Sequence, residues 1–137
     1  MHQRLKGFNI LVVEDNELNQ QVAKWLLEYN GAVVVIANHG QEALDILEAE
    51  AFDCVLMDIQ MPVLDGLEAT RLIRANPQWS SLIIIAMTAN ADEHHKELCH
   101  VAGMNDFLAK PIDPDLLVDV LLKWLIPGKR GLNRVTD

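Results

Sequence analysis

Short apolar runs alternate along the chain with longer segments in which apolar residues recur every three or four positions. The runs lie near residues 8–13, 33–37, 53–57, 82–87 and 105–108. Short apolar runs predict buried strands, and the spacing in the segments between them predicts amphipathic helices. A strand–helix unit repeated five times is typical of an open parallel sheet with helices on both faces. The sequence therefore predicts an α/β protein.

Right-handed crossovers between successive strands give a doubly wound (βα)5 open sheet, and we expect the flavodoxin-like kind, whose strand order is 2-1-3-4-5. The apolar residues of the segment after the first strand have helical spacing and are expected to face the sheet; they are Leu18, Val22, Trp25, Leu26 and Tyr29. The pair Asn30-Gly31 should end this helix, and Asp113-Pro114 should begin the last one, as an N-cap followed by proline in the first turn.

The size of the chain fits one domain. It has 137 residues, half of them hydrophobic, which is enough to bury a large core. We expect an N-terminal extension at residues 1–7, a folded domain at 8–126, and a linker or tail at 127–137. The formal net charge of −9 argues against direct nucleic-acid binding, which needs clustered Lys and Arg.

No apolar stretch approaches the roughly 20 residues needed to cross a bilayer, and the N-terminus lacks the apolar core of a signal peptide. A cytoplasmic location is therefore expected. Cys54 and Cys99 are too few for a disulfide framework and are expected to be free thiols. His95 and Cys99 have the i, i+4 spacing of a metal-binding helix face, but no second ligand pair accompanies them.

Acidic residues follow two of the predicted strands. Glu14 and Asp15 come after the first strand, and Asp58 comes after the third. The carboxyl ends of parallel strands lie at one edge of a sheet, so these carboxylates should converge there, which is unfavourable without a cation. Mg²⁺ prefers oxygen ligands and usually keeps some of its waters, so a few carboxylates suit it well.

Two further strands end in groups that complement the carboxylates. Thr88 follows the fourth strand and Lys110 follows the fifth. A phosphoryl group that enters this site would meet a metal ion on one side, and a hydroxyl and an ammonium group on the other. The residue types at the strand ends therefore favour phosphoryl chemistry.

These residues resemble the receiver domain of two-component response regulators. The resemblance covers residues 8–126 and rests on four motifs in the family's order and spacing: Val12-Val13-Glu14-Asp15-Asn16, Met57-Asp58-Ile59-Gln60-Met61-Pro62, Met87-Thr88-Ala89 and Lys110-Pro111-Ile112. It implies that Asp58 accepts a phosphoryl group from phosphohistidine. A carboxylate is ionised at neutral pH and needs no activating base.

The resemblance also assigns roles to the other residues of the motifs. Glu14, Asp15 and Asp58 would hold Mg²⁺ or Mn²⁺, together with the backbone carbonyl of Gln60. Lys110 would pair with the phosphoryl oxygens, or with Asp58 before phosphorylation. A cis peptide bond before Pro111 would direct the Lys110 ammonium into the site.

Thr88 and Phe107 resemble the family's switch pair. Phosphorylation would draw the Thr88 hydroxyl toward the new anion and open space for the aromatic ring. Many family members have Tyr at the position of Phe107, so the inward state here lacks a hydroxyl that could hydrogen-bond. The chain is expected to be a phosphoacceptor with slow self-dephosphorylation, and not an enzyme that turns over a substrate.

Other functions fit the sequence less well. A flavodoxin-like cofactor binder would need a phosphate-binding loop where Glu14 and Asp15 stand. A haloacid-dehalogenase-type phosphatase would need a second Asp at the position of Gln60. A pseudo-receiver that never accepts phosphate would not require Asp58, Thr88 and Lys110 together.

The motifs most resemble receivers of hybrid sensor histidine kinases, some of which are cytosolic parts of membrane-bound sensors. Expected partners are a histidine kinase core and a histidine phosphotransfer domain, which would dock over Leu18, Asn19 and Val22. No direct contact with nucleic acid or membrane is expected. The alternative is a stand-alone regulator that acts by protein–protein interaction. In either case the fourth helix, fifth strand and fifth helix offer the family's usual homodimer face.

Overall fold

The computed structural model describes residues 4–59 and 65–126. Within these residues one parallel sheet is formed by β1 (Asn9–Val13), β2 (Val33–Ala37), β3 (Cys54–Asp58), β4 (Ile83–Thr88) and β5 (Asp106–Ala109). The strands lie in the order β2-β1-β3-β4-β5, and every pair is parallel. The predicted fold class and strand order are confirmed.

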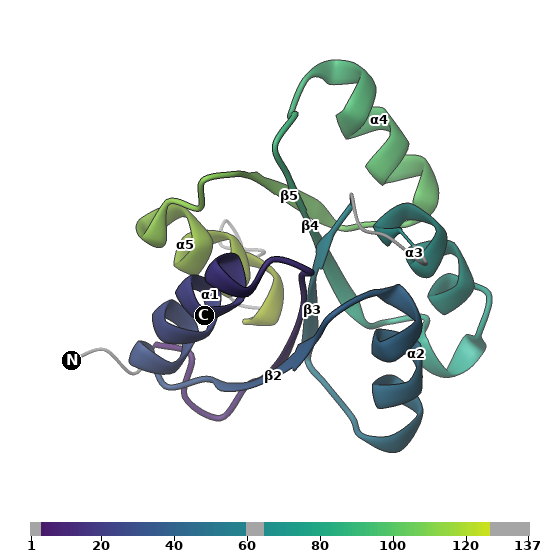
Figure 1. The fold of residues 1–137 in the computed structure, drawn as a ribbon. Coiled ribbons are helices and arrows are strands. Elements are labelled where there is room, and N and C mark those ends of the chain that lie inside the picture. The colour runs from purple at the N-terminus through teal and green to yellow at the C-terminus, as the bar shows by residue number, and fades with distance from the viewer. Residues whose placement is uncertain (1–3, 60–64, 127–137) are drawn as a thin grey trace, which may run out of the picture.

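Helices cover both faces of the sheet (Figure 1). They are α1 (Glu17–Tyr29), α2 (Gly40–Ala49), α3 (Gly66–Arg74), α4 (Glu93–Ala102) and α5 (Pro114–Leu125), with a 3-10 turn, η1 (Pro77–Trp79), after α3. α1 and α5 pack on one face, and α2, α3 and α4 on the other. Among the described residues, no helix is long and apolar enough to cross a membrane.

The central strands are apolar throughout because helices cover both of their faces. Ile10 and Val12 of β1 belong to the core on the α1/α5 side, whereas Leu11 and Val13 belong to the core on the other side. All five residues of β3 are buried. The sheet thus places the ends of β1 and β3 side by side on a rigid base.

Of the five residues predicted to turn the first helix toward the sheet, only Leu26 is buried, and the prediction is wrong for the other four. Leu18, Val22, Trp25 and Tyr29 are exposed by 72%, 45%, 63% and 48%, and the face that meets the sheet consists of Gln20, Ala23, Leu26 and Leu27. The exposed residues still have helical spacing, so they form an apolar stripe along the solvent side of α1. Trp25 and Tyr29 stack within it, with ring centroids 5.2 Å apart.

The segments around the predicted helix ends behave as expected. Asp113 caps α5 by accepting hydrogen bonds from the backbone N–H groups of Asp115 and Leu116, and Gly31, after the C-cap Asn30, has a φ of +96°.

The segment before β1 is also packed. The side chain of Leu5 is fully buried in the core, and its N–H donates to the carbonyl of Asn30. Residues just upstream of the first strand are therefore part of the packing.

Arg74 fastens the end of α3 to two other segments. Its guanidinium donates to the carbonyls of Gly103 (2.9 Å) and Trp79 (3.0 Å) and to the side-chain oxygen of Asn105 (2.9 Å). The same Asn105 oxygen accepts from the N–H of Ile84. Burial lowers the pKa of Arg74. A half-buried cation with only neutral partners thus joins α3, η1 and the turn between α4 and β5.

Candidate active site at the carboxyl ends of the strands

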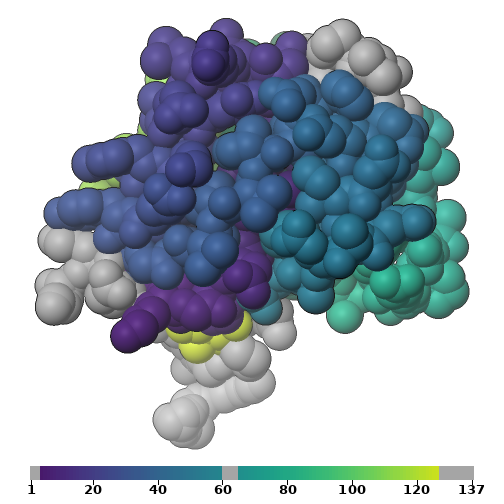
Figure 2. Space-filling model, turned by 60° about the horizontal axis from the view of Figure 1, so that its bottom comes forward, coloured from purple at the N-terminus to yellow at the C-terminus, as the bar shows by residue number. Residues whose placement is uncertain are grey.

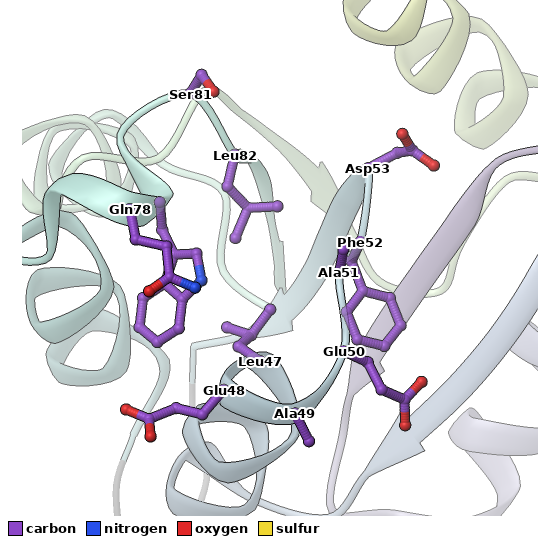
Figure 3. A pocket seen from close by; sticks show the side chains of 11 residues that line it. Leu47, Glu48, Ala49, Glu50, Ala51, Phe52, Asp53, Gln78, Ser81 and Leu82 are labelled. Carbon is purple, nitrogen blue, oxygen red and sulfur yellow. The ribbon is translucent and has the colours of Figure 1, made fainter.

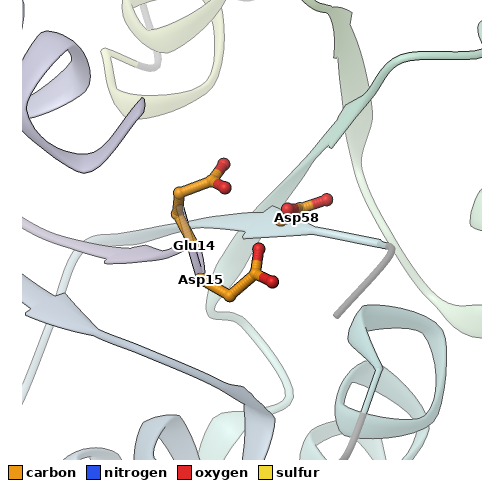
Figure 4. Close-up of side chains that lie close together, drawn as sticks. All are labelled: Glu14, Asp15 and Asp58. Carbon is orange, nitrogen blue, oxygen red and sulfur yellow. The ribbon is translucent and has the colours of Figure 1, made fainter. Parts of the chain in front are cut away.

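Three carboxylates meet where β1 and β3 end (Figure 4). Each of Glu14, Asp15 and Asp58 offers an oxygen, and these oxygens lie within 4.8 Å of one another. Glu14 and Asp58 are almost completely buried, at 2% and 3% exposure, whereas Asp15 is exposed. The parallel register explains the meeting, since Val13 pairs with Met57 and the next residues emerge at the same edge.

Lys110 lies between the two buried carboxylates. Its Nζ donates to Asp58 Oδ2 at 3.0 Å and lies 2.9 Å from Glu14 Oε1. The second contact is an ion pair outside hydrogen-bonding geometry, so Glu14 Oε1 is a buried oxygen without a hydrogen-bond partner. One ammonium therefore contacts two carboxylates, and the three carboxylates with this single ammonium leave a formal net charge of −2 at the site.

The environment of Lys110 favours its charged form. Burial alone would lower the pKa of the ammonium, but its contacts with Glu14 and Asp58 outweigh burial and raise the pKa above the ordinary value. Lys110 is therefore a fixed positive charge at neutral pH. It can hold the site together without phosphate and can meet a phosphoryl group on Asp58.

The other oxygen of Glu14 is held by the start of α1. Glu14 Oε2 accepts from the N–H of Asn16 at 3.1 Å and from Asn19 Nδ2 at 3.4 Å. The buried amide of Gln20 donates to the carbonyl of Glu14 at 2.6 Å and to Asn38 Oδ1 at 2.8 Å. Sequence reasoning did not assign these amides to the site. Their signal was the polar run Asn16–Gln20, in which one glutamine interrupts the buried face of a helix.

Thr88 ends β4 beside β3 and is buried, at 2% exposure. Its hydroxyl donates to the carbonyl of Asn90 at 2.9 Å and accepts from the N–H of Asn90 at 3.0 Å. The hydroxyl is thus engaged with its own loop. A move toward Asp58 would require it to exchange both of these bonds.

Phe107 lies in β5 opposite Ala86 of β4. Its ring is partly buried against the core on the α2/α3/α4 side, and the ammonium of Lys96 in α4 lies 4.8 Å from the ring centroid. A cation over an aromatic face stabilises that ring position. Lys96 is a second residue that sequence reasoning did not connect with the site.

Two features shape the loops around Asp58. The Lys110–Pro111 peptide bond is cis. Gly66, at the start of α3, lies so close to the loop after β3 that an added Cβ would sit 2.2 Å from the carbonyl oxygen of Asp58. The predicted metal ligand at the carbonyl of Gln60 lies outside the described residues.

Comparison with known proteins identifies the family. Residues 10–122 match the response regulator receiver domain. The chain is 45% identical over 118 residues to the sensor protein GacS of Pseudomonas syringae, and 42% identical over 120 residues to hybrid signal transduction histidine kinase E of Dictyostelium discoideum. These matches cover 84% and 85% of this chain, but only 13% and 7% of the two longer proteins.

Solved structures agree with the sequence matches. The receiver domain of sensor histidine kinase PA1611 from Pseudomonas aeruginosa, described with magnesium in its active-site cleft, superimposes with a TM-score of 0.81 at 44% identity, over 87% of this chain and 98% of that one. The receiver domain of the yeast regulator Ssk1 was solved with the histidine phosphotransfer protein Ypd1. It superimposes with a TM-score of 0.82 at 30% identity, over 88% of this chain and 90% of that one.

The chain belongs to the response regulator receiver domain family of two-component signalling. Its acidic residues fit a divalent metal ion, because they offer converging oxygens and the single ammonium of Lys110 leaves part of their negative charge uncompensated. Among the described residues, no other group of three or more His, Cys, Asp and Glu side chains is close enough to hold one ion. The pairing of His95 with Cys99 therefore gains no support, and Cys99 is buried in the core.

Proposed function

We propose that this chain is the phosphoacceptor of a phosphorelay, in which Asp58 takes a phosphoryl group from a phosphohistidine. The observation that carries the proposal is the position of Lys110, 3.0 Å from Asp58 Oδ2 and 2.9 Å from Glu14 Oε1. This arrangement places a cation beside a nearly buried carboxylate, where phosphoryl oxygens would stand.

The chemistry needs little more than position and charge. An oxygen of Asp58 attacks phosphorus, the P–N bond of phosphohistidine breaks, and its electron pair stays on the imidazole nitrogen. Lys110 then pairs with a phosphoryl oxygen. Mg²⁺ or Mn²⁺, held by Glu14, Asp15 and Asp58, would neutralise charge on the transferring group.

Thr88 would respond to phosphorylation of Asp58. Its hydroxyl would leave Asn90 and donate to a phosphoryl oxygen, and the space released would let the ring of Phe107 turn inward. Thr88 ends β4, and Phe107 lies in the neighbouring β5 with its ring against Lys96 of α4, so the change would reach the surface formed by α4 and β5.

The test is labelling with a small phosphodonor. With Mg²⁺ and acetyl phosphate, the wild type should take up about one phosphoryl group per chain, whereas Asp58→Asn should take up none. Sustained hydrolysis of a general phosphate ester would instead indicate a phosphatase. Undiminished label in Asp58→Asn would disprove the assignment of the acceptor.

A phosphotransfer partner is supported by the apolar stripe on α1. Leu18 begins the stripe one residue before Asn19, whose amide contacts Glu14, so a protein that covers the stripe also reaches the site. A helical bundle with an apolar face fits such a surface. The yeast Ssk1 receiver was crystallised with a histidine phosphotransfer protein, and the curated relatives include hybrid kinases. We infer a relay role on this basis.

Matched substitutions separate docking from chemistry. Leu18→Glu should slow phosphoryl transfer from a phosphorylated histidine phosphotransfer protein at least tenfold and leave labelling by acetyl phosphate unchanged. Val101→Glu, on α4, is the control because Val101 is exposed to a similar degree, 69% against 72%. Equal transfer in both variants would favour the alternative, a stand-alone regulator that acts through another surface.

A further inference from the structure

A pocket of about 560 Å³ lies at the edge of the sheet opposite Asp58. It is bordered by the segment between α2 and β3 and by η1 with the residues that precede β4. Figure 3 shows Leu47 and Leu82 facing one another across it, with Phe52 at its side. Trp79 also lines it. The floor is therefore apolar and partly aromatic.

The rim of this pocket is acidic. Glu48, Glu50 and Asp53 line it, and no Lys or Arg does so. Asp53 accepts a hydrogen bond from the N–H of Asn9, whereas the side chains of Glu48 and Glu50 make no hydrogen bond or ion pair with another described residue. An apolar floor with an uncompensated acidic rim suits a segment that carries both basic and apolar side chains.

Such a segment follows α5 in this chain. Residues 127–137 contain Lys129, Arg130 and Arg134 with a single acid, Asp137, and the apolar residues Leu132 and Val135. This composition is opposite to that of the whole chain, whose formal net charge is −9. Basic and apolar residues alternate over a few positions, as the pocket requires.

The path of α5 brings this segment to the correct edge. α5 starts beside Lys110 and runs back along the sheet, and its last residues pack against the same core as Phe8, which directly precedes β1. Figure 2 shows the end of α5, in yellow, at the lower margin of the face that carries the blue and teal residues of α2 and the segment after it, with purple N-terminal residues between them. An extended chain of 11 residues reaches about 36 Å, compared with a radius of gyration of about 14 Å for a domain of this size.

We propose that residues 127–137 dock in this pocket, with Lys129, Arg130 and Arg134 against the acidic rim and the apolar residues on the floor. Because the segment is covalently attached, its effective concentration is in the millimolar range and modest contacts suffice. Docking at this edge leaves Asp58 accessible and fixes the direction in which the chain leaves the domain. The proposal does not depend on phosphorylation.

The test uses the full chain with a nitroxide label on Asn133→Cys; the two native cysteines, Cys54 and Cys99, are buried and should not react. Docking predicts strong loss of amide NMR signal around residues 47–53 and 78–82, and little loss around Asp58. The triple change Lys129→Glu, Arg130→Glu and Arg134→Glu should restore the signal, as should Glu50→Lys. Glu97→Lys makes the same change of charge at an exposed position on α4. It should leave the loss of amide NMR signal unchanged.

Three results would overturn the proposal. One is signal loss spread evenly over the surface, and another is loss that persists in both Glu50→Lys and the triple variant. The third uses a mixture in which only one kind of chain carries ¹⁵N and only the other kind carries the nitroxide. Signal loss of equal size in this mixture would show that the segment in the pocket belongs to a second copy of the chain. Acetyl phosphate labelling of each variant reports separately on the proposed function.

Discussion

Gly66 touches the backbone of Asp58: a Cβ at Gly66 would sit 2.2 Å from the Asp58 carbonyl oxygen and 2.8 Å from Ile59 Cα. These are backbone atoms, so a side chain at this position cannot be accommodated by a change of rotamer. Either α3 or the loop that carries the acceptor must move.

Gly66→Ala should therefore lower stability by about 1–3 kcal/mol, as overpacking does, and slow acetyl phosphate labelling. Urea unfolding and a labelling time course measure the two effects. Gly7→Ala is a useful control, because Gly7 has a φ of +90° but nothing lies within 4 Å of its added Cβ. It should lose stability and keep its labelling rate. A normal labelling rate in Gly66→Ala would show that the contact is dispensable.

Asp15 should have opposite effects with and without metal. It is an exposed carboxylate near two buried ones, so Asp15→Asn removes repulsion and should raise stability in EDTA by up to about 1 kcal/mol. Millimolar Mg²⁺ should raise the melting temperature of the wild type by mass action, and Asp15→Asn should lose most of that rise. Asp45→Asn, at an exposed position on α2, should change neither the stability in EDTA nor the rise in melting temperature with Mg²⁺. An unchanged Mg²⁺ response in Asp15→Asn would remove it from the metal site.

Lys110 gives stability a defined pH dependence. Its folded pKa is raised above the unfolded value of about 10.4, so its contribution is complete below that pH and is lost as the pH rises through the folded pKa. Stability of the wild type should therefore fall more steeply above about pH 10.4 than that of Lys110→Met. Lys24→Met, which removes an exposed ion pair with Glu28, should leave the steep fall in place. Parallel curves for wild type and Lys110→Met would contradict the raised pKa.

Arg74→Lys should destabilise the protein by about 2 kcal/mol, because Lys cannot donate to several fixed acceptors at once. Arg71→Lys, in an exposed pair with Glu68, should change stability by less than about 0.5 kcal/mol. Chemical denaturation of the two variants makes the comparison. Equal effects would mean that the Arg74 hydrogen bonds contribute little.

Lys96 should stabilise the Phe107 ring in the position that contacts its ammonium. A cation–π contact at a partly exposed site is worth about 0.5–1 kcal/mol, so Lys96→Met should raise the inward population of Phe107 by about two- to fivefold. Fluorine NMR of a fluorinated phenylalanine at position 107, before and after phosphorylation, measures this population. Lys123→Met removes a similar contact with Trp124 and should leave the Phe107 signal unchanged. An identical ring population in the Lys96 variant would rule out the bias.

The sheet was predictable because the strands are short, mostly apolar runs, and four of the five lead to polar groups: carboxylates at β1 and β3, a hydroxyl at β4 and an ammonium at β5. All five strand ranges were predicted to within one residue, and Lys110 meets Asp58 as the sequence implied. The predicted face of α1 was wrong because Gln20 is buried to hold Glu14 and Asn38, while Trp25 and Tyr29 face solvent. Apolar spacing gives the period of a helix, but a binding surface and a core face have the same period. Gly66 and Lys96 act through contacts between segments, which one sequence does not display.

The two strands that carry Asp58 and Lys110 differ in how they should exchange amide hydrogens. β3 is central, pairs on both sides and is wholly buried, so its amides should exchange only when the entire domain opens. β5 has four residues, lies at the edge and pairs with β4 alone, so it should fray on its own. Asp58 should therefore lie on the slowest-exchanging segment, whereas Lys110 directly follows one of the fastest. We expect the segment that positions Lys110 to open and close many times during the life of one folded molecule while Asp58 stays in place.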